Sequence, residues 1–271
     1  MRKVFDFNVH LPLRADRLVD QIAVNEMEMS DKDLCRAISD YKSELSILDS
    51  ANLMLFNTSL FDNSGSLEFL ESARKFTHCH LTALVDFRRD DVIEYVDVLQ
   101  QHGVQCVKFH SYVQKITSDD FSRVLKVAEY SAERGLVLCF DASYGTLGMY
   151  SQDNLRLVCA VADRIKNSPI IILHSGGARC IEAMLIADAA PNVFLETSFT
   201  LPYYRGSRIE QDLLFVYQKI GAERILYASD FPYIRIEESI EIASGFFEKS
   251  GFSSKEIDRV FFHNSAELLK R

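Results

Sequence analysis

Short apolar runs alternate with longer amphipathic stretches along most of this chain. The runs are apolar at odd and even positions alike, which is typical of parallel strands covered on both faces. The stretches between them repeat their apolar residues at helical spacing. The runs predict strands at residues 3–10, 52–58, 81–87, 104–110, 136–142, 170–174, 193–198 and 225–230.

Two of the helical stretches carry start signals. Ser30 precedes Asp31 and Asp33, so a serine N-cap and an acidic first turn predict a helix that begins there. A second helix is expected to begin at Ser118 and to end at Gly135, because glycine readily adopts the left-handed conformation that ends helices. The sequence therefore predicts strands and helices in alternation.

Eight such repeats predict a fold of the α/β class, a single (β/α)8 TIM barrel over residues 1–271. A barrel of this kind typically occupies about 250 residues, which fits the length. No GxGxxG follows a strand, which disfavours a dinucleotide-binding fold. Residues 12–29 form the longest irregular stretch near the expected barrel mouth, and we expect them to cover it as a lid.

Composition and charge exclude several functions. The formal net charge of -9 argues against nucleic acid and against an anionic membrane surface as partners. No apolar segment is long enough for a secretory signal or a membrane span. The six cysteines are scattered without a CxxC pair, which indicates reduced thiols. We therefore expect a cytoplasmic protein.

Polar residues end the predicted strands. In a (β/α)8 barrel the carboxyl ends of all eight strands meet at one mouth, where the chemistry is placed. Four of these ends offer metal-binding side chains, and imidazoles with carboxylates could hold one divalent ion and activate a water. Lys108 and His110 share a face of the fourth strand by alternation. The four candidate ligands are His10, Asp141, His174 and Asp230.

Five short motifs resemble, in the same order, those of the amidohydrolase superfamily, and specifically its amidohydrolase-related hydrolases and decarboxylases. Each motif is weak alone, but five in order are together specific. Residues 6–10 (DFNVH) resemble DxHxH, 107–110 (VKFH) with Gln114 and Asp120 resemble VKxHP...Q...D, 173–177 (LHSGG) resemble HxGG, 229–232 (SDFP) resemble SDxP, and 264–269 (NSAELL) resemble NAxxLL.

The resemblance implies a barrel with a divalent ion at its mouth. It implies that His174 orients or polarises the substrate and that Asp230 binds metal and shuttles a proton. Two positions depart from the pattern, because Asn8 replaces the first histidine of HxH and Asp141 replaces the fifth-strand histidine. The remaining set is oxygen-rich, which favours manganese, iron or magnesium relative to zinc. A site without metal is the alternative.

Further residues are candidates for substrate binding. Lys108 could hold a substrate carboxylate, and Asn8 could form a hydrogen bond to a substrate. His110 could be a metal ligand, an acid or base, or a structural residue. Arginines follow the third, sixth and seventh strands, and Arg179 is the preferred one. Because arginine pairs with carboxylates, these cations predict a small anionic substrate, although loop arginines are often simply solvated. Asn264 is expected to tether the last helix.

Three functions remain open on the sequence. The first is a metal-dependent hydrolase of a small carboxylated ester, lactone or amide, acting through an activated water. The second is a non-oxidative decarboxylase on the same scaffold, with Asp230 protonating the product carbon. The third is a metal-free descendant that binds a ligand. All three stay open because the barrel fixes the mouth but not the chemistry. A homo-oligomer is compatible with each.

Overall fold

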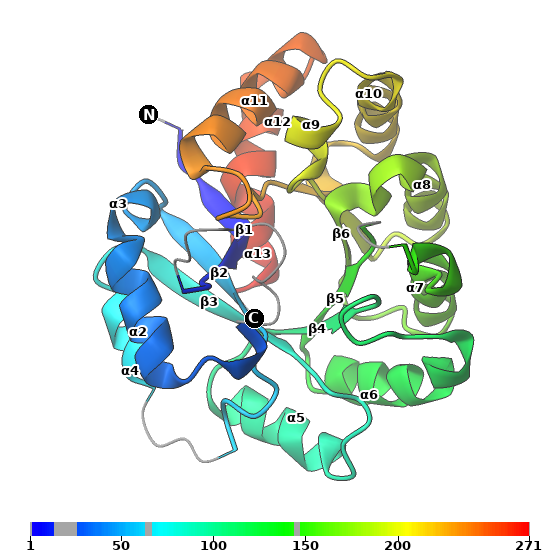
Figure 1. Cartoon of the computed structure of the whole chain (residues 1–271). Coiled ribbons are helices and arrows are strands. Elements are labelled where there is room, and N and C mark those ends of the chain that lie inside the picture. The colour runs from blue at the N-terminus through cyan, green and yellow to red at the C-terminus, as the bar shows by residue number, and fades with distance from the viewer. Residues whose placement is uncertain (1, 14–25, 63–66, 144–146, 271) are drawn as a thin grey trace.

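The computed structural model describes residues 2–13, 26–62, 67–143 and 147–270. In this part of the chain, eight parallel strands form one sheet in chain order from β1 to β8, which confirms the predicted TIM barrel (Figure 1). The strands are β1 (Phe5–His10), β2 (Ser50–Leu55), β3 (His78–Leu84), β4 (Cys106–His110), β5 (Val137–Asp141), β6 (Ile170–Leu173), β7 (Val193–Glu196) and β8 (Ile225–Leu226).

Helices surround the barrel and follow the strands in the alternation that the sequence predicts (Figure 1). The α-helices are α2 (Asp31–Asp40), α3 (Lys42–Leu45), α4 (Glu68–Ala73), α5 (Val92–Gln101), α6 (Phe121–Glu133), α7 (Asn154–Arg164), α8 (Cys180–Ala189), α9 (Thr200–Tyr203), α10 (Arg208–Ile220), α11 (Ile236–Lys249), α12 (Ser254–Asp258) and α13 (Asn264–Leu268). Short 3-10 turns are η1 (Ser118–Asp120), η2 (Met149–Ser151), η3 (His174–Arg179) and η4 (Ala222–Arg224), and η5 (Arg259–His263) is a π-helical turn.

The seam between β1 and β8 is closed by backbone hydrogen bonds. Phe7 N–H donates to the carbonyl of Tyr227 at 3.1 Å, and His10 N–H donates to that of Phe231 at 2.8 Å. Buried Asp6 adds a side-chain tie, because its Oδ1 accepts from the N–H of Ser229 at 2.9 Å. Asp6 therefore has a structural role, because it ties the first strand to the segment after the last.

The core has two layers, one between strands and helices and one inside the barrel. On β4, Val107 and Phe109 belong to the outer layer, whereas Cys106 belongs to the inner one. Side chains alternate along a strand, so Lys108 and His110 point to the same side as Cys106. The parity that the sequence predicts for these residues is therefore confirmed.

The caps of two helices refine the sequence prediction. Ser30 caps α2 in a capping box with Asp33, as expected. The second cap is Thr117 with Asp120, not Ser118, because a 3-10 turn over 118–120 precedes α6. Gly135 follows α6 with a φ of +76°, in the conformation expected of a helix-ending glycine.

Several other expectations can be compared with the structure. Asn264 donates to the carbonyls of Ala222 and Ile225 at 2.6 and 2.8 Å, which confirms the tether of the last helix. All six cysteines are free thiols. Within the described residues, no helix is long and apolar enough to cross a membrane. Of the expected lid at residues 12–29, residues 14–25 lie outside the described part of the chain.

Candidate active site at the carboxyl ends of the strands

The structure gathers the ionisable strand-end residues at one mouth of the barrel. They form two groups of close contacts between ionisable side chains, and every side chain in these groups is at most 10% exposed. In the first group, His10 lies between Glu26 and Asp230. In the second group, Asp141 is surrounded by Lys108, His110 and His174. The two groups bring together residues from β1, β4, β5, the ends of β6 and β8, and the segment before α2.

Two mouth residues stand in left-handed backbone conformations. His174 has a φ of +58° and Asp230 a φ of +64°, at the points where β6 and β8 have ended. Side chains other than glycine adopt this region rarely, at a cost of about 1–3 kcal/mol, and such residues cluster at functional sites. The chain thus turns sharply at the two residues for which the motifs imply catalytic roles.

Asp141 is the centre of the second group. Its Oδ2 lies 3.2 Å from His174 Nε2, 3.3 Å from His110 Nε2 and 3.7 Å from Lys108 Nζ. Burial alone would raise the pKa of this carboxyl, but the two histidines and the lysine outweigh it and hold the pKa well below its usual range. Asp141 is therefore ionised.

His174 donates from both ring nitrogens. Ser198 gives its single hydroxyl hydrogen to Glu196 Oε2 at 2.7 Å, so its Oγ must accept from His174 Nδ1 at 3.0 Å. The other nitrogen, Nε2, faces the Asp141 carboxylate at 3.2 Å. Burial opposes the charge, but Asp141 outweighs it and raises the pKa of His174 to about 9. At neutral pH this residue is an imidazolium.

His10 is likewise held between two carboxylates. Its Nδ1 lies 2.7 Å from Glu26 Oε2, and its Nε2 lies 3.5 Å from Asp230 Oδ1. Burial disfavours the imidazolium, but Glu26 and Asp230 raise the pKa of His10 to about 9. Burial would in turn raise the pKa of Asp230, which His10 and His174 nevertheless lower. With a side chain 10% exposed, Asp230 is the most exposed residue of the two groups.

His110 and Asn8 complete the inner face of the mouth. Burial lowers the pKa of His110 to about 3 despite the adjacent Asp141, so this imidazole is neutral. Asn8 donates from Nδ2 to Ser198 Oγ at 3.0 Å and so helps to fix the serine that contacts His174. Asn8 thus helps to position His174 through Ser198, on the side of the imidazole ring remote from Asp141.

Arg179, the sequence's preferred partner for a substrate carboxylate, is already paired with carboxylates of the chain. Its guanidinium contacts Glu182, from Nε at 2.7 Å, and its Nη1 lies 3.1 Å from Asp153 Oδ1. A substrate would have to displace these partners. The geometry therefore favours Lys108, which ends inside the barrel, as the anion-binding cation.

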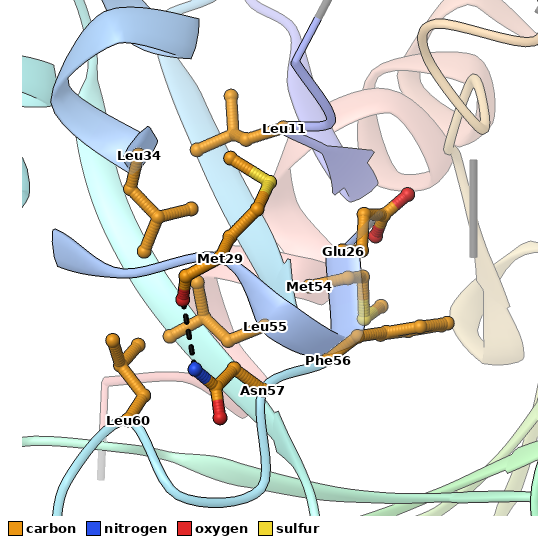
Figure 2. Close-up of a pocket in the computed structure, with 9 residues that line it drawn as sticks. All are labelled: Leu11, Glu26, Met29, Leu34, Met54, Leu55, Phe56, Asn57 and Leu60. Carbon is orange, nitrogen blue, oxygen red and sulfur yellow. Dashed lines mark hydrogen bonds between the residues drawn. The ribbon is translucent and has the colours of Figure 1, made fainter. Parts of the chain in front are cut away.

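A small apolar pocket adjoins the mouth between Glu26 and Phe56 (Figure 2). Asn57 closes one side of it by donating to the carbonyl of Met29 at 2.8 Å, as Figure 2 shows. The cavity measures about 10 Å³, which is room for about one water molecule. We therefore assign it no substrate.

Sequence reasoning missed Glu26 and Ser198. Glu26 lies in the irregular stretch that the sequence marks as a lid, and only the folded chain brings it to His10. Ser198 ends the predicted seventh strand, but a serine at a strand end gives no sign of its partners. The one signal in the sequence was that Glu26 is a carboxylate within the irregular stretch nearest the mouth.

The expected metal ligands meet only part of what a divalent ion needs. Ligands bonded at about 2.0–2.2 Å lie roughly 3–3.5 Å apart, which both His–Asp pairs satisfy. The pairs do not converge, however. Among the described residues, Asp31, Cys35 and Glu68 form a group of three whose ligand atoms all lie within 4.8 Å of one another, and this group lies outside the barrel. The described residues of the mouth form no such group. The mouth as arranged does not fit a metal.

That outer group is explained by helix capping. Both carboxylate oxygens of Asp31 accept backbone N–H groups at the start of α4, from Glu68 and Phe69, at 3.0 Å each. The carboxylate therefore satisfies the free N–H groups of a helix N-terminus. It carries no argument for a metal.

Comparison with known proteins decides the family. A family model described as amidohydrolase matches residues 80–271. The chain belongs to the amidohydrolase family. The match covers four of the five motifs that indicate the resemblance, from VKFH at 107–110 to the last helix. A search of curated protein sequences found no match.

Solved structures share the fold at low sequence identity. An uncharacterised TIM-barrel protein, Bb4693 from Bordetella bronchiseptica, is 15% identical with a TM-score of 0.72, over 98% of each chain. A putative 2-pyrone-4,6-dicarboxylic acid hydrolase from Pseudomonas putida is 16% identical with a TM-score of 0.62, over 99% of this chain and 98% of that one. A dihydroxybenzoic acid decarboxylase from Polaromonas sp. JS666, with bound manganese and the inhibitor 2-nitroresorcinol, is 14% identical with a TM-score of 0.63, over 100% and 97%.

Proposed function

We propose that this amidohydrolase-family chain hydrolyses a small ester, lactone or amide that carries a carboxylate. The observation that carries the proposal is the presence, at one mouth, of an ionised carboxylate and a doubly protonated imidazole. These are Asp230 and His174. Hydrolysis needs one group that takes a proton and one that gives a proton, and at neutral pH these two residues are in those states.

The proton transfers can be assigned to named atoms. The Asp230 carboxylate takes a proton from water while the water oxygen bonds to the substrate's carbonyl carbon. The bond from that carbon to the leaving oxygen or nitrogen then breaks, and the leaving atom takes the Nε2 proton of His174. Solvent afterwards returns a proton from Asp230 to His174, which restores both residues.

The N–H donors of Lys108 support an anionic substrate. The cations of the mouth face the carboxylates of Glu26, Asp141 and Asp230, but Lys108 makes no hydrogen bond to the described residues. The Pseudomonas putida neighbour is named for a dicarboxylic acid and the Polaromonas one for a dihydroxybenzoic acid. A small aromatic or lactone carboxylate fits this pattern. The free cysteines support the cytoplasm as the compartment.

Decarboxylation is the second candidate, because the manganese-bound neighbour is a decarboxylase on the same fold. In this reaction the bond between the ring carbon and the carboxyl carbon breaks, carbon dioxide leaves, and the carbon takes a proton from a mouth residue. The sequence analysis expects that donor to be Asp230. The ionised state of Asp230 disfavours this role and leaves His174 as the available donor.

The product distinguishes the two reactions. We expect carboxylated lactones and esters to release acid without carbon dioxide, and Asp230→Asn to lower the rate about 100-fold or more. Asp188→Asn, on the exposed surface of α8, is the matched control and should leave the rate unchanged. Carbon dioxide release from hydroxybenzoates would establish the decarboxylase instead. Inactivity on the esters and lactones and on the hydroxybenzoates would contradict both proposed reactions.

A further inference from the structure

Lys108 is a buried ammonium with unfilled hydrogen-bonding capacity. The residue is 1% exposed, on the inner side of β4. Its Nζ lies 4.8 Å from the centroid of the Phe56 ring and 3.7 Å from Asp141 Oδ2. Among the described residues, it makes an ion pair and a ring contact but no hydrogen bond within 3.5 Å. A lysine has three N–H donors, and leaving them unmet in a buried site is costly.

The ammonium lies beside a residue that the sequence predicts as a ligand of a divalent ion. Asp141 is one of the predicted ligands, and its Oδ2 already serves Lys108, His110 and His174. An ion bound to that oxygen would lie beside a fixed positive charge in a site shielded from water. Repulsion between like charges is strong at such separations.

The second predicted pair lacks further ligands. His10 Nε2 lies 3.5 Å from Asp230 Oδ1, a separation that suits two ligands of one ion. Among the described residues, however, no third His, Cys, Asp or Glu ligand atom lies within 4.8 Å of both. A divalent ion at a catalytic site needs at least three protein ligands, so this pair does not complete a metal site.

We propose that the Lys108 ammonium, held by Asp141 and Phe56, supplies the cationic hydrogen-bond donors at this mouth, so that the site binds the oxygens of an anionic ligand without a divalent ion. A carboxylate or a phenolate oxygen is the ligand chemistry that its free donors fit. The inference deepens the proposed function and rests on it for the identity of the reaction. Anion binding itself requires no turnover.

The first arm of the test measures metal. The purified full-length chain is analysed for metals by mass spectrometry, dialysed against a chelator, and titrated with Mn²⁺ and Zn²⁺ in a calorimeter. We expect well under one metal ion per chain and no tight binding of either ion. One tightly bound ion per chain that disappears in His10→Ala would overturn the proposal.

The second arm measures anion binding by the chelated protein. Benzoate, phthalate and succinate are titrated by calorimetry, and we expect at least one to bind, with an affinity that added Mn²⁺ does not change. Lys108→Met should weaken that binding about 10-fold or more, and Lys108→Arg should restore part of it. Lys3→Met is the matched control, because Lys3 also lies over a ring, that of Phe262 at 5.4 Å, but on the exposed surface.

The outcomes separate this inference from the proposed function. Saturable anion binding that depends on Lys108 supports the inference even if no ester or lactone is hydrolysed. Binding that requires Mn²⁺, or binding that Lys108→Met leaves intact, contradicts it even if hydrolysis is observed. Absence of binding by all three anions also counts against it. The wild-type comparison with and without Mn²⁺ decides the matter should Lys108→Met fail to fold.

Discussion

Glu26 shows how much a single residue contributes to this mouth. It is 4% exposed and lies 2.7 Å from His10 Nδ1, so it fixes the ring with its other nitrogen toward Asp230. A carboxylate behind an imidazole sets both its orientation and its protonation state. Glu26 is therefore a positioning residue, which acts on the reaction through His10.

Glu26→Gln should lower the pKa of His10 from about 9 toward its ordinary value of 6.5, because the amide keeps the shape but removes the charge. Histidine titration by NMR measures this directly. Glu28→Gln, which changes an exposed residue of the same turn, should leave the titration of His10 unchanged. An identical His10 curve in wild type and Glu26→Gln would show that Glu26 does not set its charge.

The element that most shapes the site is the turn between β6 and α8. His174, Ser175, Gly176 and Gly177 all have positive φ values, so the chain reverses tightly before α8 begins. Gly176 also packs against this helix, because a Cβ at this position would lie 2.8 Å from Ala183 Cβ. The glycines of the LHSGG motif therefore allow this tight turn, which keeps His174 at the end of the strand.

Gly176→Ala should destabilise the protein by about 2–4 kcal/mol, since the strain of a positive φ adds to a clash with α8. Gly103→Ala is the matched control, with the same φ of +78° and no atom within 4 Å of the added Cβ. It should cost only the backbone strain, about 1–2 kcal/mol. Urea unfolding measures both variants, and equal losses would show that contact with Ala183 is immaterial.

Across the whole molecule, the mouth joins distant parts of the barrel through buried charge. Glu26, Asp141 and Asp230 carry negative charge, and they are balanced by His10 and His174 together with Lys108. Partners in these ion pairs lie on different elements, from the start of the chain to the end of β8. Because buried charges are stable only when paired, the fold depends on their protonation.

The free energy of unfolding should therefore fall as pH rises from about 6.5 to 9. The folded pKa values of His10 and His174 are about 9, above the ordinary 6.5, so their stabilisation is complete below 6.5 and lost on passing 9. The loss is on the order of 3 kcal/mol for each residue. Urea unfolding at pH 6, 7.5 and 9 measures it.

His174→Asn should flatten this pH dependence by roughly half. His263→Asn, a change at an exposed histidine, is the control and should leave the dependence as in wild type. A wild-type stability that is constant or rising across the interval would show that the imidazoles are not held as cations in the fold.

The sequence by itself determined the architecture and the place of the site. Strand and helix follow from the period of apolar residues, which is a local property, and parallel strands bring their carboxyl ends to one mouth. Hence the sequence alone could assign His10, Asp141, His174 and Asp230 to one barrel mouth. The glycine after α6 and the cap of α2 were predictable for the same reason, because only near neighbours decide them.

The tertiary structure alone decided which partner each side chain takes. Arg179 follows the HSGG motif as expected, yet it pairs with Glu182 and Asp153 of its own chain. Lys108 reaches Asp141 from a neighbouring strand, and Glu26 reaches His10 across a stretch without a periodic pattern. These pairings depend on distances of a few ångströms between residues far apart in the chain. Periodicity carries no such information, because it fixes the face of an element and not the position of a charge.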